Sequence, residues 1–254
     1  MIEAQPSAFH RWLVTAYFRR KARRRFAAVL ERGLPHLADW NNGGPARTPL
    51  ILLANHSSWW DAAMPFLVSF GACRHDAYAI MEHRQLDRFR FFARAGAFSI
   101  VREHPRQALR TLRYGAELLR GSSRVLWIYP QGVIVPNDAG PIVGYPGAAH
   151  LVQMLGGCMV AAVAFRYQLL RHELPVAYVS IGQPQPMAAA AGRDGIRATH
   201  AQMMELLTNE VESLRAAVVA ESTEGFRELL RGKRSVDEWW SRVKGGNGDS
   251  AGMS

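Results

Sequence analysis

One stretch of the chain, residues 50–61, constrains the fold more than any other. Its aliphatic part, Leu50–Ala54, predicts a buried β-strand that stops abruptly at polar residues. Ser57 and Ser58 then suit the amino-terminal cap of a helix predicted over residues 61–70. A strand that leads directly into a helix is typical of open α/β folds, whose sites lie at the carboxyl edge of the sheet.

A histidine and an aspartate follow this strand. His56 and Asp61 are about 140° apart around an ideal helix, because each residue turns the chain by about 100°. The two side chains therefore meet only if His56 lies in the turn before the helix. In that geometry the aspartate accepts the N–H of one ring nitrogen and leaves the other nitrogen as a general base. The alternative is a helix-capping histidine beside an unrelated surface aspartate.

The composition favours a folded domain with a basic surface. Hydrophobic residues make up 48% of the 254 residues, which is enough for a sizeable core. The formal net charge of +10 predicts an acidic partner, such as nucleic acid, anionic lipid or a phosphorylated substrate. Cys73 and Cys158 lie in apolar surroundings with no disulfide or metal-site spacing, which favours a reducing compartment. The amino end lacks the features of a signal peptide.

Residues 1–40 are predicted to form a basic amphipathic segment, with a helix over about residues 7–33. Apolar side chains fall near one helical face: Phe9, Trp12, Leu13, Ala16, Tyr17, Phe26, Val29 and Leu30. A basic cluster is expected on the other side: Arg11, Arg19, Arg20, Lys21, Arg23, Arg24 and Arg25. This pattern is typical of a helix in an anionic membrane interface. Two alternatives are a helix packed against the domain and a nucleic-acid patch, although no nucleic-acid motif appears elsewhere.

Short apolar strands alternate with helices in the remaining chain. Strands are expected over residues 50–54, 75–81, 96–102, 125–129, 159–165 and 175–181. Helices are expected over residues 61–70, 83–95, 105–120, 147–155, 200–220, 226–230 and 236–243. The pattern predicts one α/β domain, with a mostly parallel or mixed sheet flanked by helices and preceded by the amphipathic helix.

The domain is predicted to span residues 41–243, after a turn-rich linker over residues 39–49. The glycine-rich tail, residues 244–254, is expected to be disordered. The uncharged stretch 139–165 contains too many glycines and prolines for a spanning helix, so no transmembrane segment is expected.

Four short motifs together resemble, in order, the four blocks of the glycerolipid acyltransferase family (lysophosphatidic acid acyltransferase-like). They are Asn55-His56 with Asp61, the stretch from Gly96 to Arg102, Tyr129-Pro130-Gln131-Gly132, and the strand Val160–Ala164. The blocks of the family run Asn-His-x4-Asp, Gly-x-Phe-x-x-x-Arg, Phe-Pro-Glu-Gly-Thr-Arg, and a strand of the Val-Pro-Val type. The resemblance covers residues 50–184.

The resemblance implies transfer of an acyl group from a thioester, on coenzyme A or acyl carrier protein, to a hydroxyl group of a lipid. His56 is then the general base, and Asp61 orients its ring. The expected substrate-binding residues are Asn55, Gly96, Arg102, Tyr129, Pro130, Gln131 and Gly132. A thioester is already activated, so no cofactor or metal is expected. Backbone N–H groups after His56, or in the loop at residues 130–132, are expected to stabilise the oxyanion.

The third block departs from the family pattern. Gln131 stands where the family has Glu, and Val133 and Ile134 stand where it has Thr (or Ser) and Arg. In the family that Arg pairs with glycerol phosphate, and isoleucine cannot replace an arginine fork. We therefore expect a less charged acceptor than lysophosphatidic acid, such as a glycosylated or hydroxylated isoprenoid or an amino-acid lipid. Arg102 is either a remaining phosphate partner or a structural ion-pair partner.

Two other functions stay open at the level of sequence. The altered third block also fits a non-catalytic relative that binds lipid or acyl thioester. The other alternative is a thioesterase-like hydrolase on the same scaffold, in which water replaces the alcohol. The basic amino-terminal helix predicts a peripheral or monotopic protein on the cytoplasmic face of a membrane. Trp59 and Trp60 either line an acyl tunnel or pack against the first helix.

Overall fold

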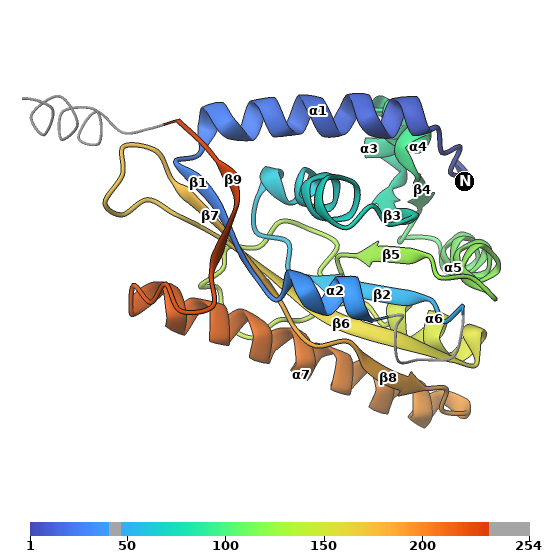
Figure 1. Cartoon of the computed structure of the whole chain (residues 1–254). Coiled ribbons are helices and arrows are strands. Elements are labelled where there is room, and N and C mark those ends of the chain that lie inside the picture. Colours follow the sequence, from blue (N-terminus) through green and yellow to red (C-terminus); the bar gives the residue numbers. More distant parts are fainter. Residues whose placement is uncertain (41–46, 234–254) are drawn as a thin grey trace, which may run out of the picture.

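The aliphatic run Leu50–Ala54 is a strand, and all of its side chains are buried. The computed structural model describes residues 1–40 and 47–233, and in these residues nine strands form one sheet (Figure 1). The strands are β1 (Ala28–Arg32), β2 (Leu50–Ala54), β3 (Ala77–Glu82), β4 (Ala97–Ile100), β5 (Val125–Ile128), β6 (Gly157–Gln168), β7 (Val176–Ile181), β8 (Gln185–Ala188) and β9 (Arg227–Arg231).

The helices cover both faces of this sheet. They are α1 (Ala8–Arg25), α2 (Leu34–Asp39), α3 (His83–Arg88), α4 (Phe91–Ala95), α5 (Pro105–Leu119), α6 (Gly147–Leu155) and α7 (Gly192–Val219), with the 3₁₀ turn η1 (Trp59–Ala62) and the π-helix η2 (Phe66–Ala72). The predicted α/β fold with a mixed sheet flanked by helices is confirmed.

Strand direction decides which residues meet at each edge of the sheet. The order is β4-β3-β5-β2-β6-β7-β1-β9, and β8 pairs with β6. Neighbours from β4 to β6 are parallel, whereas β7 runs antiparallel to β6 and parallel to β1. The carboxyl ends of β2, β5 and β6 therefore share one edge, and those of β1 and β7 lie at the opposite edge.

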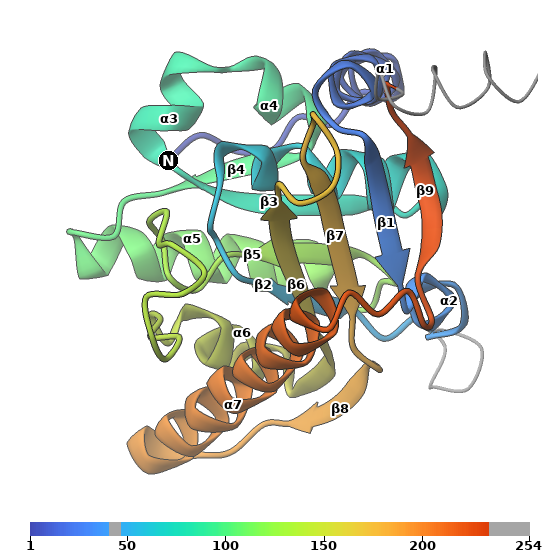
Figure 2. The same cartoon turned by 90° about the vertical axis from the view of Figure 1, so that its left-hand side faces the viewer.

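Alternate side chains of β2 build the core on the two faces. Leu50 and Leu52 belong to a cluster with η2, while Ile51 and Leu53 belong to a cluster with α5 and α6. α7 packs on the same face as α6, and α1 forms an outer layer over η2 on the other face (Figures 1 and 2). This alternation follows from the two-residue period of a strand.

The amino-terminal helix is shorter than the sequence predicts. It ends at Arg25, and the predicted continuation to residue 33 is wrong because β1 pairs in parallel with β7. Val29 and Glu31 are buried at the two-residue spacing of a strand. Pairing with a distant strand thus overrides the helical spacing of the apolar residues.

The two sides of α1 also differ from the prediction. Val14, Phe18 and Ala22 face inward and pack on η2 and α4. Apolar residues, among them Trp12, occupy the outward side of its first half, and arginines such as Arg24 occupy the same side of its second half. The basic cluster therefore follows the exposed apolar residues along the helix instead of lying opposite them.

Other predicted elements need smaller corrections. The helix expected over residues 226–230 is the strand β9, antiparallel to β1, in which Leu230 is buried. The helix expected over residues 61–70 is divided into η1 and η2, and that over 83–95 into α3 and α4. α7 begins at Gly192, before the predicted residue 200.

The helix predicted over residues 236–243 and the tail at 244–254 lie outside the described residues, as do residues 41–46 of the linker. Among the described helices, none has the length and apolar character needed to cross a bilayer.

Candidate active site

His56 and Asp61, which we call the dyad, meet at the carboxyl edge of β2. Nδ1 of His56 lies 2.8 Å from Oδ2 of Asp61. The imidazole side chain is 23% exposed, whereas the carboxylate is fully buried. Because a carboxylate accepts hydrogen bonds, Nδ1 carries the proton, and the Nε2 lone pair is left for an incoming group.

The spacing of the dyad follows from the local turn. Ser58 caps η1, since its side chain accepts from the Trp60 N–H and its own N–H donates to the carboxylate of Asp61. Asp61 is thus both the N3 residue of a capping box and the partner of His56. The histidine lies in the turn before the helical segment, as the sequence predicts.

The buried carboxylate of Asp61 has hydrogen-bond donors on both oxygens. Oδ2 accepts from the backbone N–H groups of Ser57 (2.6 Å) and Ser58 (2.8 Å), in addition to His56. Oδ1 accepts from the phenol of Tyr167 at 2.6 Å. A buried carboxylate is tolerated only where its oxygens are satisfied in this way.

Two tyrosines secure this part of the site. The hydroxyl group of Tyr129 donates to the main-chain carbonyl of Asp61 (2.7 Å), and the Tyr129 ring lies 4.9 Å from that of His56. Burial, and then the charge of Asp61, raise the pKa of Tyr129 and that of Tyr167 well above the ordinary value for a phenol. Both phenols therefore remain protonated donors through the neutral range.

Asn55 has a structural role at the ends of β2 and β6. Its side chain is buried, accepts from the N–H of Phe165 (2.7 Å) and donates to the carbonyl of the same residue (3.0 Å). It also donates to the side chain of Asn137 at 2.9 Å. These bonds fix the residue before His56 and hold the loop after β5 against the sheet.

The loop that follows β5 covers the dyad from the other side. Oε1 of Gln131 accepts from the backbone N–H of His56 (2.7 Å), and the carbonyl of His56 accepts from the N–H of Val135 (2.8 Å). Pro130 is buried, and its carbonyl accepts from the N–H of Tyr145. Since the oxygen of the Gln131 amide faces His56, its Nε2 group is directed away from that bond.

Arg102 reaches the same loop after β4. Its Nε donates to Oε2 of Glu82 (2.9 Å), and its guanidinium stacks on the ring of Tyr145 at 5.4 Å. Gly132 has a φ of +70°, and a Cβ added there would lie 2.1 Å from Nη1 of Arg102. Glycine at this position therefore allows the arginine to approach the loop.

Gly96 lies away from the dyad, at the amino end of β4, and its role in substrate binding stays a prediction. It precedes β4, which places it at the opposite edge of the sheet from the carboxyl end of that strand. Its φ is +117°, and an added Cβ would lie 2.8 Å from the carbonyl oxygen of Ala77. The residue ends α4 and allows close packing on β3.

The structure narrows the choice of oxyanion donors. Ser57 and Ser58 use their N–H groups on Asp61, and the N–H of Trp60 is bound to the Ser58 hydroxyl. These three amides after His56, which the sequence leaves as one option, are therefore already occupied. In the other option, the loop at residues 130–132, Pro130 has no N–H and the N–H of Gly132 donates to the carbonyl of Tyr129 (3.1 Å), so Gln131 is the residue of this loop that has donors to offer.

Tyr167 and Glu82 are two neighbours of the site that the sequence does not single out. The expected strand ends at Phe165, whereas β6 continues to Gln168 and carries the phenol to Asp61. Alternation after Val163 and Phe165 is the signal that places Tyr167 on the same face. No local pattern identifies Glu82, which reaches Arg102 from the end of β3.

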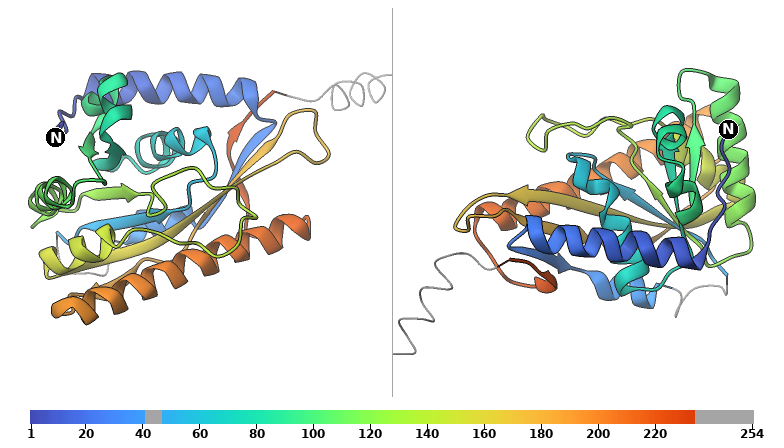
Figure 3. Two further views of the ribbon diagram at one scale, coloured as in Figure 1. Left: turned by 180° about the vertical axis from the view of Figure 1, so that it is seen from behind. Right: turned by 90° about the horizontal axis from the view of Figure 1, so that it is seen from above.

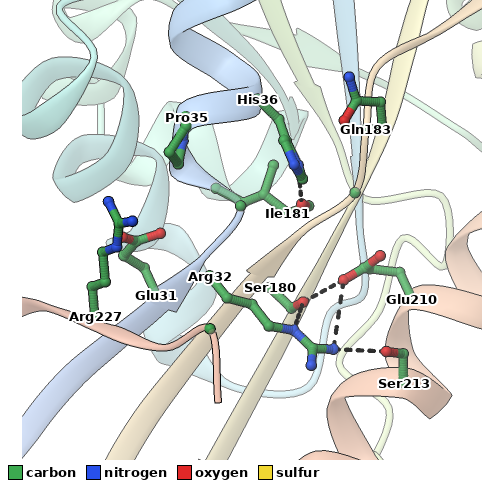
Figure 4. Close-up of a pocket in the computed structure, with 13 residues that line it drawn as sticks. Glu31, Arg32, Pro35, His36, Ser180, Ile181, Gln183, Glu210, Ser213 and Arg227 are labelled. Atoms are coloured by element: carbon green, nitrogen blue, oxygen red, sulfur yellow. Dashed lines mark hydrogen bonds and ion pairs between the residues drawn. The ribbon is translucent and has the colours of Figure 1, made fainter. Parts of the chain in front are cut away.

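The opposite edge of the sheet holds a cavity of about 420 Å³ (Figure 4). There, Arg32 donates to the hydroxyls of Ser180 (2.6 Å) and Ser213 (2.8 Å), and Glu210 accepts from Ser180. These bonds tie β1, β7 and α7 together. None of the site residues predicted from sequence lines this cavity. In residues 1–40 and 47–233, no three or more His, Cys, Asp or Glu side chains are placed to hold a metal ion.

The dyad thus lies at the carboxyl edge of a mixed sheet that helices cover on both faces. Residues 34–166, just over half of the chain, match the Acyltransferase family, and the chain belongs to this family. It is also similar to the 1-acyl-sn-glycerol-3-phosphate acyltransferase of Saccharomyces cerevisiae, with 28% identity over 109 residues. The matched part is 42% of this chain but only 36% of the yeast protein. The resemblance to glycerolipid acyltransferases is thereby confirmed.

Proposed function

We propose that this protein transfers a fatty acyl group from a thioester, on coenzyme A or acyl carrier protein, to the hydroxyl group of a lipid. The observation that carries the proposal is the 2.8 Å contact between Nδ1 of His56 and the buried carboxylate of Asp61. Membership in the Acyltransferase family supports the reaction type. The donor, the acceptor and the roles of the two residues belong to the proposal.

The proposed reaction begins at the dyad. Nε2 of His56 removes the proton of the acceptor hydroxyl as its oxygen attacks the carbonyl carbon of the thioester. Asp61 holds the ring through Nδ1 and stabilises the imidazolium. When the tetrahedral intermediate collapses, the carbon–sulfur bond breaks and the proton on Nε2 passes to the leaving sulfur. The products are a lipid ester and a free thiol, and His56 is neutral again.

The oxyanion donors are assigned to the loop after β5. The amides of Ser57 and Ser58 already donate to Asp61, and in the loop the N–H of Gly132 donates to Tyr129, so the proposal rests on Gln131. In this proposal the Nε2 group of Gln131 supplies a neutral donor, because the oxygen of its amide is bound to the N–H of His56. A preorganised donor of this kind stabilises charge that develops in the transition state.

We propose a weakly charged lipid alcohol as the acceptor, in place of lysophosphatidic acid. Ile134, where the family has arginine, is an exposed residue of the loop. The nearby guanidinium of Arg102 is already neutralised by Glu82 at 2.9 Å. Neither residue offers the free arginine fork that a phosphate monoester prefers. Ile134→Arg should therefore raise activity on lysophosphatidic acid, and efficient use of that lipid by the wild type would overturn the proposal.

We also propose that α1 binds the anionic cytoplasmic face of a membrane as a peripheral element. Four apolar residues on its outward side are between 47% and 65% exposed: Phe9, Trp12, Leu13 and Tyr17. The exposed arginines of its second half, such as Arg20 and Arg24, follow on the same side. Basic residues near such a surface contribute about 1 kcal/mol each. Trp12→Ser/Leu13→Ser should weaken binding to vesicles that contain phosphatidylglycerol.

The test of the reaction compares lipid products by mass spectrometry. Purified wild type and His56→Ala are incubated with acyl-coenzyme A, acyl carrier protein loaded with a fatty acid, and a lipid extract of the host cell. His104→Ala is the matched control, because this exposed histidine lies before α5, outside the dyad. An acylated lipid made by the wild type and the control, but not by His56→Ala, is the expected result.

The same experiment separates the other two functions. Free fatty acid that depends on His56 and not on an acceptor would indicate a hydrolase. The absence of any His56-dependent product with every donor would indicate a binding protein and refute the catalytic role of the dyad.

A further inference from the structure

The segment formed by α3 and α4 presents a second exposed surface of aromatic and basic side chains. Phe89 and Phe91 are 36% and 43% exposed, and their ring centroids are 6.3 Å apart. Exposed arginines flank these rings: Arg84, Arg88, Arg90 and Arg94. We infer that this segment is a second contact with the anionic bilayer, and the inference rests on the membrane association proposed for α1.

α4 is fixed beside the first half of α1. The N–H of Ser7 donates to the carbonyl of Arg94 at 2.9 Å, so the residue before α1 is bound to α4. Phe18 of α1 stacks on Phe92 of α4 with their centroids 6.3 Å apart. Figures 1 and 3 show α3 and α4 next to this end of α1, on the side of the sheet away from α7. The two exposed surfaces therefore move as one body.

The chemistry of the second surface matches that of an anionic bilayer. Aromatic rings bury into the boundary between headgroups and acyl chains, while arginines reach the lipid phosphates. Asp87 is paired with Arg90, which leaves Arg84, Arg88 and Arg94 as excess positive charge. A second copy of the chain would bring arginines against arginines on this surface, and like charges oppose such a dimer.

A second contact determines the orientation of the bound protein. A single interfacial helix allows the domain to roll about the helix axis. Contacts through both α1 and α4 remove this freedom and direct α7 away from the bilayer, because α7 covers the other face of the sheet (Figure 2).

The test is co-sedimentation of the full chain with vesicles of phosphatidylcholine alone and of an equimolar mixture with phosphatidylglycerol. Two variants alter the second surface, Arg84→Gln/Arg88→Gln and Phe89→Ser/Phe91→Ser. The control Arg193→Gln/Arg197→Gln removes the same charge from exposed positions on α7. Each arginine that contacts anionic lipid is expected to raise the partition coefficient roughly fivefold, so the arginine variant should bind roughly 25-fold more weakly. The α7 control should bind like the wild type.

The outcomes separate this inference from the proposal for α1. Normal binding by both α3–α4 variants, with loss in Trp12→Ser/Leu13→Ser, overturns the second contact and leaves α1 as the membrane element. Absence of binding by the wild type overturns both. Equal weakening in the α7 control shows an effect of net charge alone and overturns the second contact. A wild-type dimer that dissociates in the α3–α4 variants also overturns it. Since Phe91 packs on Phe92, the folding of each variant is checked by a thermal melt. If the phenylalanine variant does not fold, the binding of the arginine variant alone tests the second contact.

Discussion

Replacing Tyr167 by phenylalanine tests how the dyad is held. The change removes only the hydroxyl group of the side chain, and with it the 2.6 Å hydrogen bond to Oδ1 of Asp61. Hydrogen bonds to charged groups contribute about 1.5–3 kcal/mol, and the carboxylate is fully buried, so water does not take the place of the phenol. We expect the free energy of unfolding to fall by about 2 kcal/mol, which lowers the melting temperature by roughly 4–8 °C in a domain of this size.

The same change should lower activity. Without the phenol, the carboxylate that orients the ring of His56 loses one of the groups that hold it in place. We expect kcat/KM to fall roughly tenfold in Tyr167→Phe, because misplacement of a reacting group slows the reaction. The assay follows release of free thiol from acyl-coenzyme A in the presence of the acceptor found by mass spectrometry.

Tyr129→Phe is the matched control. Its hydroxyl donates to the main-chain carbonyl of Asp61 and not to the carboxylate. The pKa of each phenol lies well above its ordinary value, through burial and the charge of Asp61, so both phenols are protonated at the pH of the assay. The control should lose stability with a smaller loss of kcat/KM. Equal kcat/KM in wild type and Tyr167→Phe, or an equal loss in the control, would refute the role assigned to Tyr167.

Three further predictions concern single positions. Gly132→Ala should lower kcat/KM and stability, by about 1 kcal/mol from backbone strain alone, because φ is +70° and the new Cβ meets Arg102; a normal melt and full activity would contradict this. Burial lowers the pKa of His75, so the native state binds fewer protons than the unfolded state. His75 therefore does not reduce the free energy of unfolding above the unfolded-state pKa near 6.5, and the free energy of unfolding falls as the pH drops below that value. His75→Gln should flatten this pH dependence in denaturant titrations. Burial raises the pKa of Cys73 to about 11 and that of Cys158 to about 12, so Ellman's reagent at neutral pH should react slowly with the native protein and rapidly in denaturant.

The elements around the site are predictable because their signals are local. β2, β5 and α6 are apolar stretches with a clear beginning and end, and the predicted ranges agree closely with the structure. β1 and β9 are not predictable in this way. Ala28 pairs with Val176 and Arg231, so residues far away in the chain decide that the segment is a strand. Leu, Glu and Arg within β1 and β9 favour a helix when only local propensity is considered.

The residues of the site differ in the same way: those close together in the chain are predictable from the sequence, and those brought in by distant strands are not. The dyad and the capping serine lie within one turn, which is why the spacing of His56 and Asp61 indicates their contact. Gly96 fits its motif, but the motif does not reveal which end of β4 reaches the site. Tyr167 comes from a strand that follows the dyad by about a hundred residues, and only the pairing of β6 with β2 brings it to Asp61.

The dyad and the proposed membrane surface are connected by η1. This turn directs Asp61 into the core and Trp59 outward, where the indole is 54% exposed. Lys21 of α1 lies 4.3 Å from the centre of the Trp59 ring, and Phe18 contacts the same ring at 6.2 Å. The residues that hold α1 on the domain thus contact the turn that orients His56. If α1 and α4 rest on the bilayer as proposed, we expect Trp59 to lie near its boundary, on the turn that orients the dyad.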